Sequence, residues 1–267
     1  MKNYVLIGGA GFVAPRHYNA IKETGGNLLA IFDPHDSVGV LDNHFPDCKY
    51  FSTLERFIRY CTSETIDYWV VCSPNHFHDV HCWMGLSMGS DVICEKPLVL
   101  NERNFEELLS MEQKSGHRIW NILQLRLSET AVHLKKLHDF SKLRGTAYLE
   151  YYTPRGDWYD YSWKMVLEKS GGAATNIGIH LFNLLLWLFG TDYTIMHWVN
   201  DKRRSTGTIR FGNFEITIIL SIEKGFKPKR VLSINTGEFD FSKEFGDLHT
   251  LSYEKILAGE GFGIEDV

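Results

Sequence analysis

The chain has 267 residues, of which 44% are hydrophobic and 23% charged, so it can bury a sizeable core and lacks the composition of a disordered protein. This length predicts two domains of ordinary size. A net charge of −5 argues against nucleic acid as the main partner, and any anion site must therefore be a local basic pocket.

Five cysteines are scattered along the chain with neither a CxxC pair nor a histidine cluster beside them. We therefore expect buried thiols, no disulfide and no metal site, in a protein of the reducing cytoplasm. Residues 1–8 form a short apolar strand pattern that ends in glycines, which is neither a signal peptide nor a membrane anchor. The longest apolar stretch, Leu184 to Phe189, is too short to span a bilayer, so we expect no membrane partner.

Up to about residue 125, short apolar strands alternate with helical patterns. The strands are predicted at residues 5–7, 28–32, 68–72, 92–94 and 119–123. The helices are predicted at residues 15–23, 54–61, 77–88 and 102–114, with Asn101 as an N-cap and Gly116 as a C-terminal stop for the last. This alternation predicts an α/β fold that begins with a doubly wound, Rossmann-type nucleotide-binding domain.

After a linking helix at residues 127–140, longer runs of alternating polarity begin. They predict strands at residues 146–153, 195–199, 206–211, 214–223, 230–235 and 238–241, with one apolar helix at residues 178–188. This pattern is typical of an α+β domain with a mostly antiparallel open sheet. We therefore place the Rossmann domain at residues 1–125 and a domain for substrate binding and oligomerisation at residues 126–267.

The first strand leads into the glycine turn Gly9-x-Gly11-x-x-Ala14, and a helix follows from near Pro15. This strand, turn and helix setting is the one that a dinucleotide-binding loop requires. The glycines permit a tight turn and a close approach of the backbone to pyrophosphate, which amide groups at the helix start stabilise. We expect cofactor contacts from the whole turn, namely from Gly9, Gly11, Phe12 and Val13.

The second strand closes at Asp33, 22 residues beyond Gly11. A carboxylate at this position can accept hydrogen bonds from both ribose hydroxyls and would repel a 2′-phosphate, which favours NAD over NADP. The alternative is a glycine turn in some other α/β protein, with Asp33 as a helix cap.

Two further strands are followed by polar side chains at their carboxyl ends. Open α/β sheets place their ligands at these ends. Ser73, Asn75 and His78 follow one strand and are expected to line the nicotinamide ribose, although Asn75 could simply cap the next helix. Lys96 follows the next strand, and such a lysine is often a solvated surface group. Beside an oxidised nicotinamide, like charge would lower the pKa of Lys96 toward a range useful for proton transfer.

The glycine-rich segment from Gly171 to His180 places Asn176 and His180 four residues apart. If the segment is helical, both side chains project from one face, and Gly172 and Gly178 allow a ligand to come close. The alternative is that Asn176 caps a helix and His180 is a satisfied histidine at a domain seam.

These motifs together resemble the Gfo/Idh/MocA oxidoreductases. The matching segments follow in order along nearly the whole chain: the glycine turn, Ser73-Pro74-Asn75, Glu95-Lys96-Pro97 and the run from Gly171 to His180. The resemblance implies a nicotinamide-dependent sugar oxidoreductase. It also implies that Glu95, Lys96 and Gln124 contact the cofactor.

Within this family, other segments resemble the bacterial UDP-N-acetylglucosaminuronate 3-dehydrogenases. These segments include residues 14–17, 94–101, 123–127, 162–164, 168–178, 247–250 and 261–266. The resemblance implies oxidation of the 3-hydroxyl of the nucleotide sugar by NAD. The 3-keto product would then pass to a PLP-dependent aminotransferase in the synthesis of O-antigen or another surface polysaccharide.

The resemblance also implies roles at the reacting hydroxyl. We expect His180 to act as the base and Lys96 to polarise the hydroxyl, without fixing the order of the two, while Asn176 orients it. The wider family often has Asp where this chain has Asn176, and a neutral amide would spare a uronate carboxylate from repulsion. Candidates for binding that carboxylate or the diphosphate are Arg155, Trp163 and Lys164. The alternative is that these three form a surface loop.

Two departures from the family pattern affect the outer parts of the expected fold. The chain stops at Val267, where similar proteins usually continue with another helical segment, and the stretch between Gly190 and Gly237 is abbreviated. A homodimer or homotetramer built through the sheet face is implied by the resemblance.

The alternatives for function are a dehydrogenase of another nucleotide sugar or polyol, and a regulator that binds NAD and sugar without turnover.

Overall fold

The computed structural model describes residues 1–137, 139–235, 237–242 and 248–267, which divide into two compact units. Unit 1 comprises Met1–Ile122 and His249–Val267, and unit 2 comprises Leu123–Leu248. The predicted second domain ran to residue 267, but the segment from His249 onward belongs to unit 1. Helix α9 (Leu248–Leu257) explains this, because its Tyr253 and Ile256 are buried in a core cluster of unit 1. Asp247, part of one family-like segment, lies outside the described residues.

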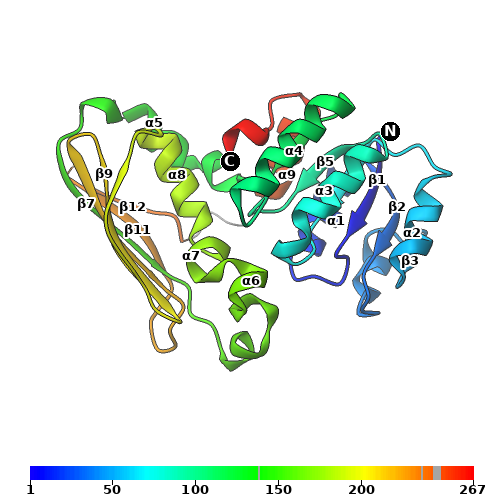
Figure 1. Cartoon of the computed structure of the whole chain (residues 1–267), viewed down its shortest axis with the longest axis horizontal. Coiled ribbons are helices and arrows are strands. Elements are labelled where there is room, and N and C mark those ends of the chain that lie inside the picture. The colour runs from blue at the N-terminus through cyan, green and yellow to red at the C-terminus, as the bar shows by residue number, and fades with distance from the viewer. Residues whose placement is uncertain (138, 236, 243–247) are drawn as a thin grey trace. The chain divides into compact units, whose positions relative to one another are not determined.

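Unit 1 contains a parallel sheet with the strand order β3-β2-β1-β4-β5-β6 among the described residues (Figure 1). The strands are β1 (Asn3–Ile7), β2 (Asn27–Phe32), β3 (Lys49–Phe51), β4 (Tyr68–Val71), β5 (Asp91–Cys94) and β6 (Ile119–Asn121). The order reverses between β1 and β4, which is where doubly wound sheets bind ligands at their carboxyl ends. The predicted Rossmann topology is thus confirmed.

Helices connect these strands: α1 (Ala14–Glu23), α2 (Leu54–Cys61), α3 (His78–Ser87) and α4 (Glu102–Ser115). The predicted ends of α4 are confirmed, because Asn101 accepts a hydrogen bond from the Asn104 amide and Gly116 has φ of 72°. Cys61, Cys72, Cys82 and Cys94 are buried free thiols, as expected, and Cys48 is a half-buried one.

Unit 2 is built on a mixed sheet with the strand order β12-β11-β7-β10-β9-β8. The strands are β7 (Gly145–Tyr152), β8 (Thr194–Asn200), β9 (Arg204–Phe211), β10 (Phe214–Ser221), β11 (Lys229–Ile234) and β12 (Gly237–Asp240). The pair β7 and β10 is parallel, and the other described pairs are antiparallel. The prediction of a mostly antiparallel sheet is therefore right, with one parallel pair at its centre.

Helix α8 (Ile179–Phe189) covers one face of this sheet (Figure 1). Leu181, Leu184, Leu185 and Leu188 recur with the period of a helix and pack in the same cluster as the buried side chains of β7, β9 and β10. Burial of each leucine contributes about 1.5–3 kcal/mol to stability. The linking helix α5 (Glu129–Leu137) adds Ala131 and Leu134 to this cluster.

The helix is interrupted between α7 (Gly172–Asn176) and α8. The two helical stretches Leu167–Asn176 and Ile179–Phe189 meet at a bend of 50°. Asn176 and His180 therefore do not share one continuous helix, so the condition under which a common face was predicted is not met. Gly178 permits the break, because an added Cβ would lie 2.4 Å from the Ala174 carbonyl oxygen. Among the described residues no single helix is long and apolar enough to cross a membrane, although this bent pair passes that test by length and composition.

Candidate active site

The glycine turn of unit 1 is packed so closely that side chains are excluded from it. A Cβ on Gly9 would lie 2.5 Å from Ile31 Cδ1, and one on Gly11 would lie 3.0 Å from the Gly8 carbonyl oxygen. Gly8 has φ of 93°, and a Cβ there would meet the backbone of Cys72 and Ser73 at 2.6 Å. The turn leads directly into α1, which has Pro15 in its first turn. This geometry suits the backbone contact with pyrophosphate that the sequence predicts.

Two other members of the predicted turn differ in exposure. Phe12 is 86% exposed, whereas Val13 is partly buried against a core cluster of unit 1. Their contact with a cofactor stays a prediction.

Asp33 lies at the end of β2 and is fixed by the turn itself. Its Oδ2 accepts a hydrogen bond of 3.0 Å from the Ala10 amide, and its Oδ1 accepts one of 2.9 Å from the His35 amide. The carboxyl group is buried, yet each oxygen retains acceptor capacity for a ribose hydroxyl. The residues present therefore fit the NAD ribose that the sequence predicts at this position.

The loop after β4 is tied to the loop after β5 by a buried histidine. His78 Nε2 lies 2.7 Å from the Ser73 carbonyl oxygen, and His78 Nδ1 lies 2.7 Å from the Pro97 carbonyl oxygen. Both ring nitrogens thus lie at hydrogen-bonding distance from carbonyl oxygens of unit 1, and the contact of His78 with the nicotinamide ribose stays a prediction. The Ser73 hydroxyl lies 2.8 Å from His81 Nδ1, and burial lowers the pKa of His81 to about 4. Asn75 is buried and is the first residue of the short helix η2 (Asn75–Phe77) in this loop.

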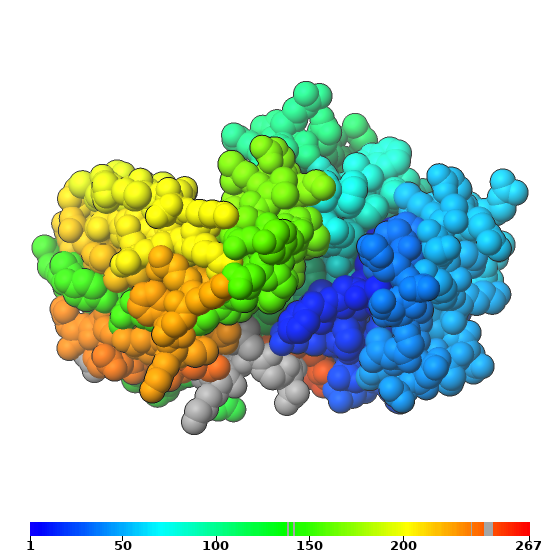
Figure 2. Space-filling model, turned by 90° about the horizontal axis from the view of Figure 1, so that it is seen from below, coloured from blue at the N-terminus to red at the C-terminus, as the bar shows by residue number. Residues whose placement is uncertain are grey.

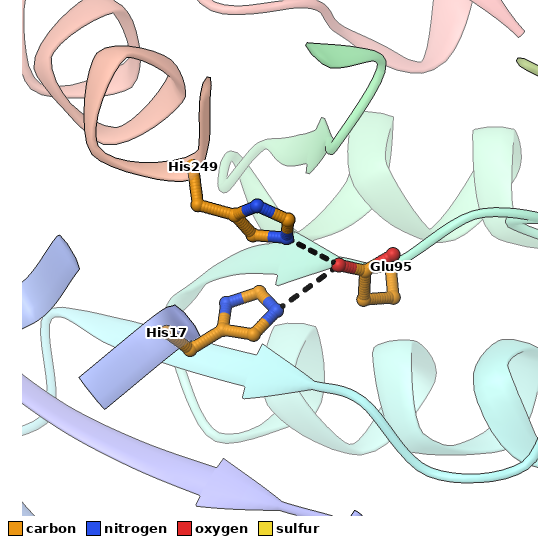
Figure 3. A group of neighbouring side chains, drawn as sticks. All are labelled: His17, Glu95 and His249. Carbon is orange, nitrogen blue, oxygen red and sulfur yellow. Dashed lines mark hydrogen bonds and ion pairs between the residues drawn. The ribbon is translucent and has the colours of Figure 1, made fainter. Parts of the chain in front are cut away.

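Glu95 directly follows β5 and lies between two histidines (Figure 3). Glu95 Oε1 accepts hydrogen bonds from His249 Nε2 at 2.8 Å and from His17 Nε2 at 3.3 Å. Burial alone would raise the pKa of Glu95, but these two hydrogen bonds hold it well below its usual range. The carboxylate is therefore anionic, and its predicted contact with the cofactor stays a prediction. We expected no metal site, yet these three side chains are of metal-ligating types and their ligand atoms lie within 4.8 Å of one another.

Lys96 follows Glu95 and is half-buried, so it is not the freely solvated lysine of the alternative interpretation. Its amide donates a hydrogen bond of 3.3 Å to Glu95 Oε2. The backbone of Lys96 is therefore held by the side chain that precedes it, at the carboxyl edge of the sheet.

In unit 2, Asn176 is buried and its Nδ2 donates a hydrogen bond of 2.9 Å to the hydroxyl oxygen of Tyr159. Tyr159 comes from the short helix η5 (Asp157–Tyr161) and is buried. The N-cap position of α8 is Gly178, so Asn176 does not cap that helix as the alternative interpretation proposed. His180 is half-buried in the first turn of α8.

The predicted anion-binding residues of unit 2 are partly withdrawn from solvent. Arg155 is half-buried, and its Nη1 donates to the Thr153 hydroxyl at 2.8 Å and to the carbonyl oxygens of Thr153 and Pro154. Lys164 is also half-buried, and its ammonium lies 5.7 Å from the ring centroid of Trp163. In the described part of the chain neither cation is paired with a carboxylate.

The positive charges of Lys164, Arg155 and Arg230 influence one another. Burial lowers the pKa of Lys164, and the neighbouring charge of Arg155 lowers it further. Burial likewise lowers the pKa of Arg155; Tyr159 and Tyr151 partly offset this shift, and the charge of Arg230 adds to it. Arg230 lies over the ring of Tyr151 at 5.3 Å from its centroid. Half-buried cations that repel one another form a site that an anionic ligand would stabilise.

Gln124 belongs to unit 2 and lies in the short helix η3 (Gln124–Leu127). Its Oε1 is buried and has no hydrogen-bond partner among the described residues. A buried acceptor without a partner is a group that a ligand donor could satisfy, which fits the predicted contact of Gln124 with the cofactor.

Comparison with known proteins identifies the family. Residues 2–122 match the model described as oxidoreductase family, NAD-binding Rossmann fold, and residues 146–234 match the C-terminal α/β domain of the same family. The chain belongs to the Gfo/Idh/MocA oxidoreductase family, and unit 1 contains its NAD-binding Rossmann domain.

Individual relatives agree with this assignment. The WlbA (WbpB) dehydrogenase of Thermus thermophilus, solved with NAD and UDP-GlcNAcA, is 38% identical over 100% of this chain and 91% of its own, with a TM-score of 0.93. A second structure of that enzyme, with NAD and α-ketoglutarate, gives a TM-score of 0.94. An uncharacterized oxidoreductase of Streptococcus pneumoniae is 23% identical over 89% of this chain. The chain spans 63% of the length of that curated relative.

Sequence reasoning missed several residues that the structure places beside the predicted ones. They are His17, His249, Tyr159 and Arg230. His17 and His249 are distant in sequence from Glu95 and from each other, so no local motif connects them. The short segments that contain them do belong to the family-like set, and this was the available signal.

Proposed function

We propose that the protein oxidises the 3-hydroxyl of UDP-N-acetylglucosaminuronic acid with NAD, in the synthesis of a surface polysaccharide. The observation that carries this proposal is the pair of half-buried cations Arg155 and Lys164, which have no carboxylate partner in the described part of unit 2. A uronate carboxylate or a diphosphate is the anion that such a pair would bind. The 38% identical enzyme of Thermus thermophilus, solved with NAD and UDP-GlcNAcA, supports the same substrate.

The proposed chemistry requires a base and a group that polarises the hydroxyl. Bound NAD would supply the acceptor for the hydride of carbon 3, and the hydroxyl proton would have to pass to a base. We assign to His180 the role of the base that accepts this proton and to Lys96 the role of polarising the hydroxyl. The amide of Asn176 orients the hydroxyl. The products are the 3-keto nucleotide sugar, NADH and one proton.

The neutral amide of Asn176 supports an anionic substrate. A carboxylate at this position would repel a uronate, whereas an amide can donate or accept without a net charge. Tyr159 fixes the direction of that amide, because it accepts a hydrogen bond from Asn176 Nδ2.

The deciding experiment is mass spectrometry of the nucleotide sugar after incubation with the protein, NAD and 2-oxoglutarate. The 2-oxoglutarate is included to recycle the cofactor, since the Thermus thermophilus enzyme was solved with that compound. A loss of two mass units that is absent with Lys96→Met would support the proposal. Preference for UDP-GlcNAc would move the assignment to another sugar, and binding of both ligands without turnover would favour a regulator.

We also propose that the sheet of unit 2 carries the contact of a homodimer or homotetramer. Strand β8, in the yellow part of the surface in Figure 2, exposes the apolar side chains of Ile195, Met196 and Val199 by 46–55%. Exposed apolar side chains on a sheet favour burial against another copy. Analytical ultracentrifugation tests this proposal, and a monomer at micromolar concentration would contradict it.

A further inference from the structure

A buried cluster in unit 1 holds the carboxylate that precedes Lys96. His17 lies on α1, His249 lies on α9, and both rings point toward Glu95 at the end of β5 (Figure 3). The three residues are 0%, 2% and 5% exposed. Glu95 Oε1 accepts from both histidines, and His249 gives the shorter contact at 2.8 Å.

The acceptor fixes the protonation of both rings. A carboxylate oxygen only accepts, so the Nε2 of each histidine must carry the hydrogen. His17 Nδ1 lies 2.8 Å from the hydroxyl of Tyr253, which can donate to it. The hydrogen bonds thus run from Tyr253 through His17 to Glu95, while His249 donates from the other side. Burial lowers the pKa of His17, which agrees with a neutral ring in this arrangement.

His249 retains this contact although its other nitrogen is left without a partner. Its Nδ1 is buried and has no hydrogen-bond partner among the described residues. A buried polar atom without a partner lowers stability, so an apolar side chain would fill this space at a lower free energy than a histidine does. The Nε2 hydrogen bond to Glu95 is the feature of His249 that an apolar side chain of similar size could not supply.

The effect of this hydrogen bond passes to Lys96. Glu95 Oε2 accepts from the Lys96 amide at 3.3 Å, so rotation of the carboxylate would break this contact with the Lys96 backbone. On the far side of Lys96, the Pro97 carbonyl oxygen lies 2.7 Å from His78 Nδ1. The residue that carries the proposed catalytic amine is therefore flanked by two contacts from buried histidines.

We propose that His249 is a positioning residue, which acts with His17 through the Glu95 carboxylate to fix the Lys96 backbone for catalysis. This inference rests on the proposed function, in which Lys96 polarises the substrate hydroxyl. It assigns to the C-terminal helix α9 a role in the chemistry of the Rossmann unit. A misplacement of a catalytic group by about 1 Å can lower a rate by about 100-fold.

Hydrogen bonding explains this geometry better than a metal ion does. A metal would require the two Nε2 atoms and Oε1 to converge on a common point between them. Here both Nε2 atoms are directed at Oε1 itself, at hydrogen-bonding distances (Figure 3).

The test compares His249→Leu, which removes the donor, with His249→Gln, whose amide nitrogen can replace Nε2. Thr250→Ala is the matched control, because Thr250 lies on the same helix and its hydroxyl makes an exposed hydrogen bond to Glu23. Four quantities are measured on each purified full-length protein: kcat and KM in the mass-spectrometric assay, the Kd for NAD, and the unfolding temperature.

We expect His249→Leu to lower kcat about 10- to 100-fold while the Kd for NAD stays within about threefold. His249→Gln should recover kcat to within about fivefold of the wild type, and Thr250→Ala should leave it unchanged. This split of kcat from binding, with rescue by glutamine, is not expected of a residue that only stabilises the fold.

If His249→Leu fails to fold, Tyr253→Phe replaces it. That variant removes only the hydroxyl that donates to His17 Nδ1, and we expect a decrease in kcat of about three- to tenfold. A wild-type kcat in whichever of these variants folds would overturn the proposal. So would one equivalent of zinc that persists through dialysis against EDTA in the wild type and is absent from His249→Leu. Full activity of Lys96→Met would instead overturn the proposed function, so the two failures are distinguishable.

Discussion

Asn176 and Tyr159 form a buried pair in unit 2, in which the amide Nδ2 donates to the tyrosine hydroxyl oxygen at 2.9 Å. The contact joins α7 to the loop segment that also carries Arg155. Burial raises the pKa of Tyr159, so the hydroxyl stays protonated and can act as donor or acceptor. The pair therefore sets the direction of the only amide that we assign to the reacting hydroxyl.

Asn176→Asp tests whether this amide suits an anionic sugar. The tyrosine hydroxyl can donate to the new carboxylate, so we expect the fold to be kept. The added negative charge should lower kcat/KM for UDP-N-acetylglucosaminuronic acid about 10- to 100-fold through repulsion of the uronate. Steady-state kinetics with UDP-GlcNAc provide the comparison, because kcat/KM for this sugar, which lacks the carboxylate, should decrease much less. Equal losses for the two sugars would show that the neutrality of Asn176 is irrelevant to specificity.

Arg155→Met and Lys164→Met test the anion site. Each removes one half-buried cation, and a charged hydrogen bond contributes about 1.5–3 kcal/mol, so KM for the uronate should rise about 10- to 150-fold. Lys227→Met is the control, because it removes the same charge from an exposed position of unit 2. Titration with the nucleotide sugar measures the effect. Unchanged KM in both variants would leave Arg155 and Lys164 as surface-loop residues.

Asp33→Ala tests the cofactor assignment. The variant loses the acceptors for the ribose hydroxyls and also the contact with the Ala10 amide, so Kd for NAD should rise about 10- to 100-fold. Asp36→Ala, in the exposed loop that follows, should bind NAD as the wild type does. Fluorescence titration with NAD and NADP separates a loss of selectivity from general unfolding, since NADP should suffer less. Undiminished affinity for NAD in Asp33→Ala would contradict the assignment.

The Rossmann unit could be predicted because its signals are local. The glycine turn, the caps Asn101 and Gly116 and the short apolar strands each depend on a few adjacent residues. Strand β3 was missed because its three residues, Lys49–Phe51, do not form a buried apolar run: Lys49 is exposed and the two aromatic residues are half-buried. The return of α9 to unit 1 was missed for another reason, since its buried residues show where it packs only when the fold is known.

The candidate site was predicted in part. Motif residues such as Lys96 and Asp33 stand at strand ends, and strand ends can be located from sequence. The partners of Glu95 could not be predicted, because His17 and His249 reach it from opposite ends of the chain. The sequence left open whether one helix runs from Asn176 to His180, since a close backbone contact at Gly178 cannot be seen in a hydrophobic pattern.

Gly9→Ala tests the packing of the glycine turn separately from its chemistry. The new Cβ would lie 2.5 Å from Ile31 Cδ1 and 3.0 Å from the Tyr18 hydroxyl, and overpacking of this kind costs about 1–3 kcal/mol. Gly39→Ala is the control, because a Cβ there would meet nothing within 4 Å. Urea unfolding should show a lower midpoint for Gly9→Ala alone. Equal midpoints for the two variants would mean that β2 relaxes away from the turn.

The buried histidines and Glu95 predict how stability changes with pH. Burial lowers the pKa of His17 in the folded protein from its ordinary value of 6.5, so the unfolded chain binds its proton more readily. Below pH 6.5 the unfolded state gains protons that the folded state does not, and the free energy of unfolding must fall. The pKa of Glu95 is also lowered in the folded state, against 4.5 ordinarily, so its contribution is present above pH 4.5 and is lost below it.

Chemical denaturation between pH 4 and pH 8 checks this sign. Stability should be greatest above pH 6.5 and decrease steadily toward pH 4, and His17→Gln should decrease less steeply between pH 6.5 and pH 5 because glutamine does not titrate. His78 and His81 add to the wild-type slope in the same direction, because burial lowers the pKa of each. The slope should therefore become smaller in His17→Gln without vanishing. A steeper slope in that variant would show that His17 is protonated in the folded protein and that its hydrogen bond to Glu95 is an ion pair.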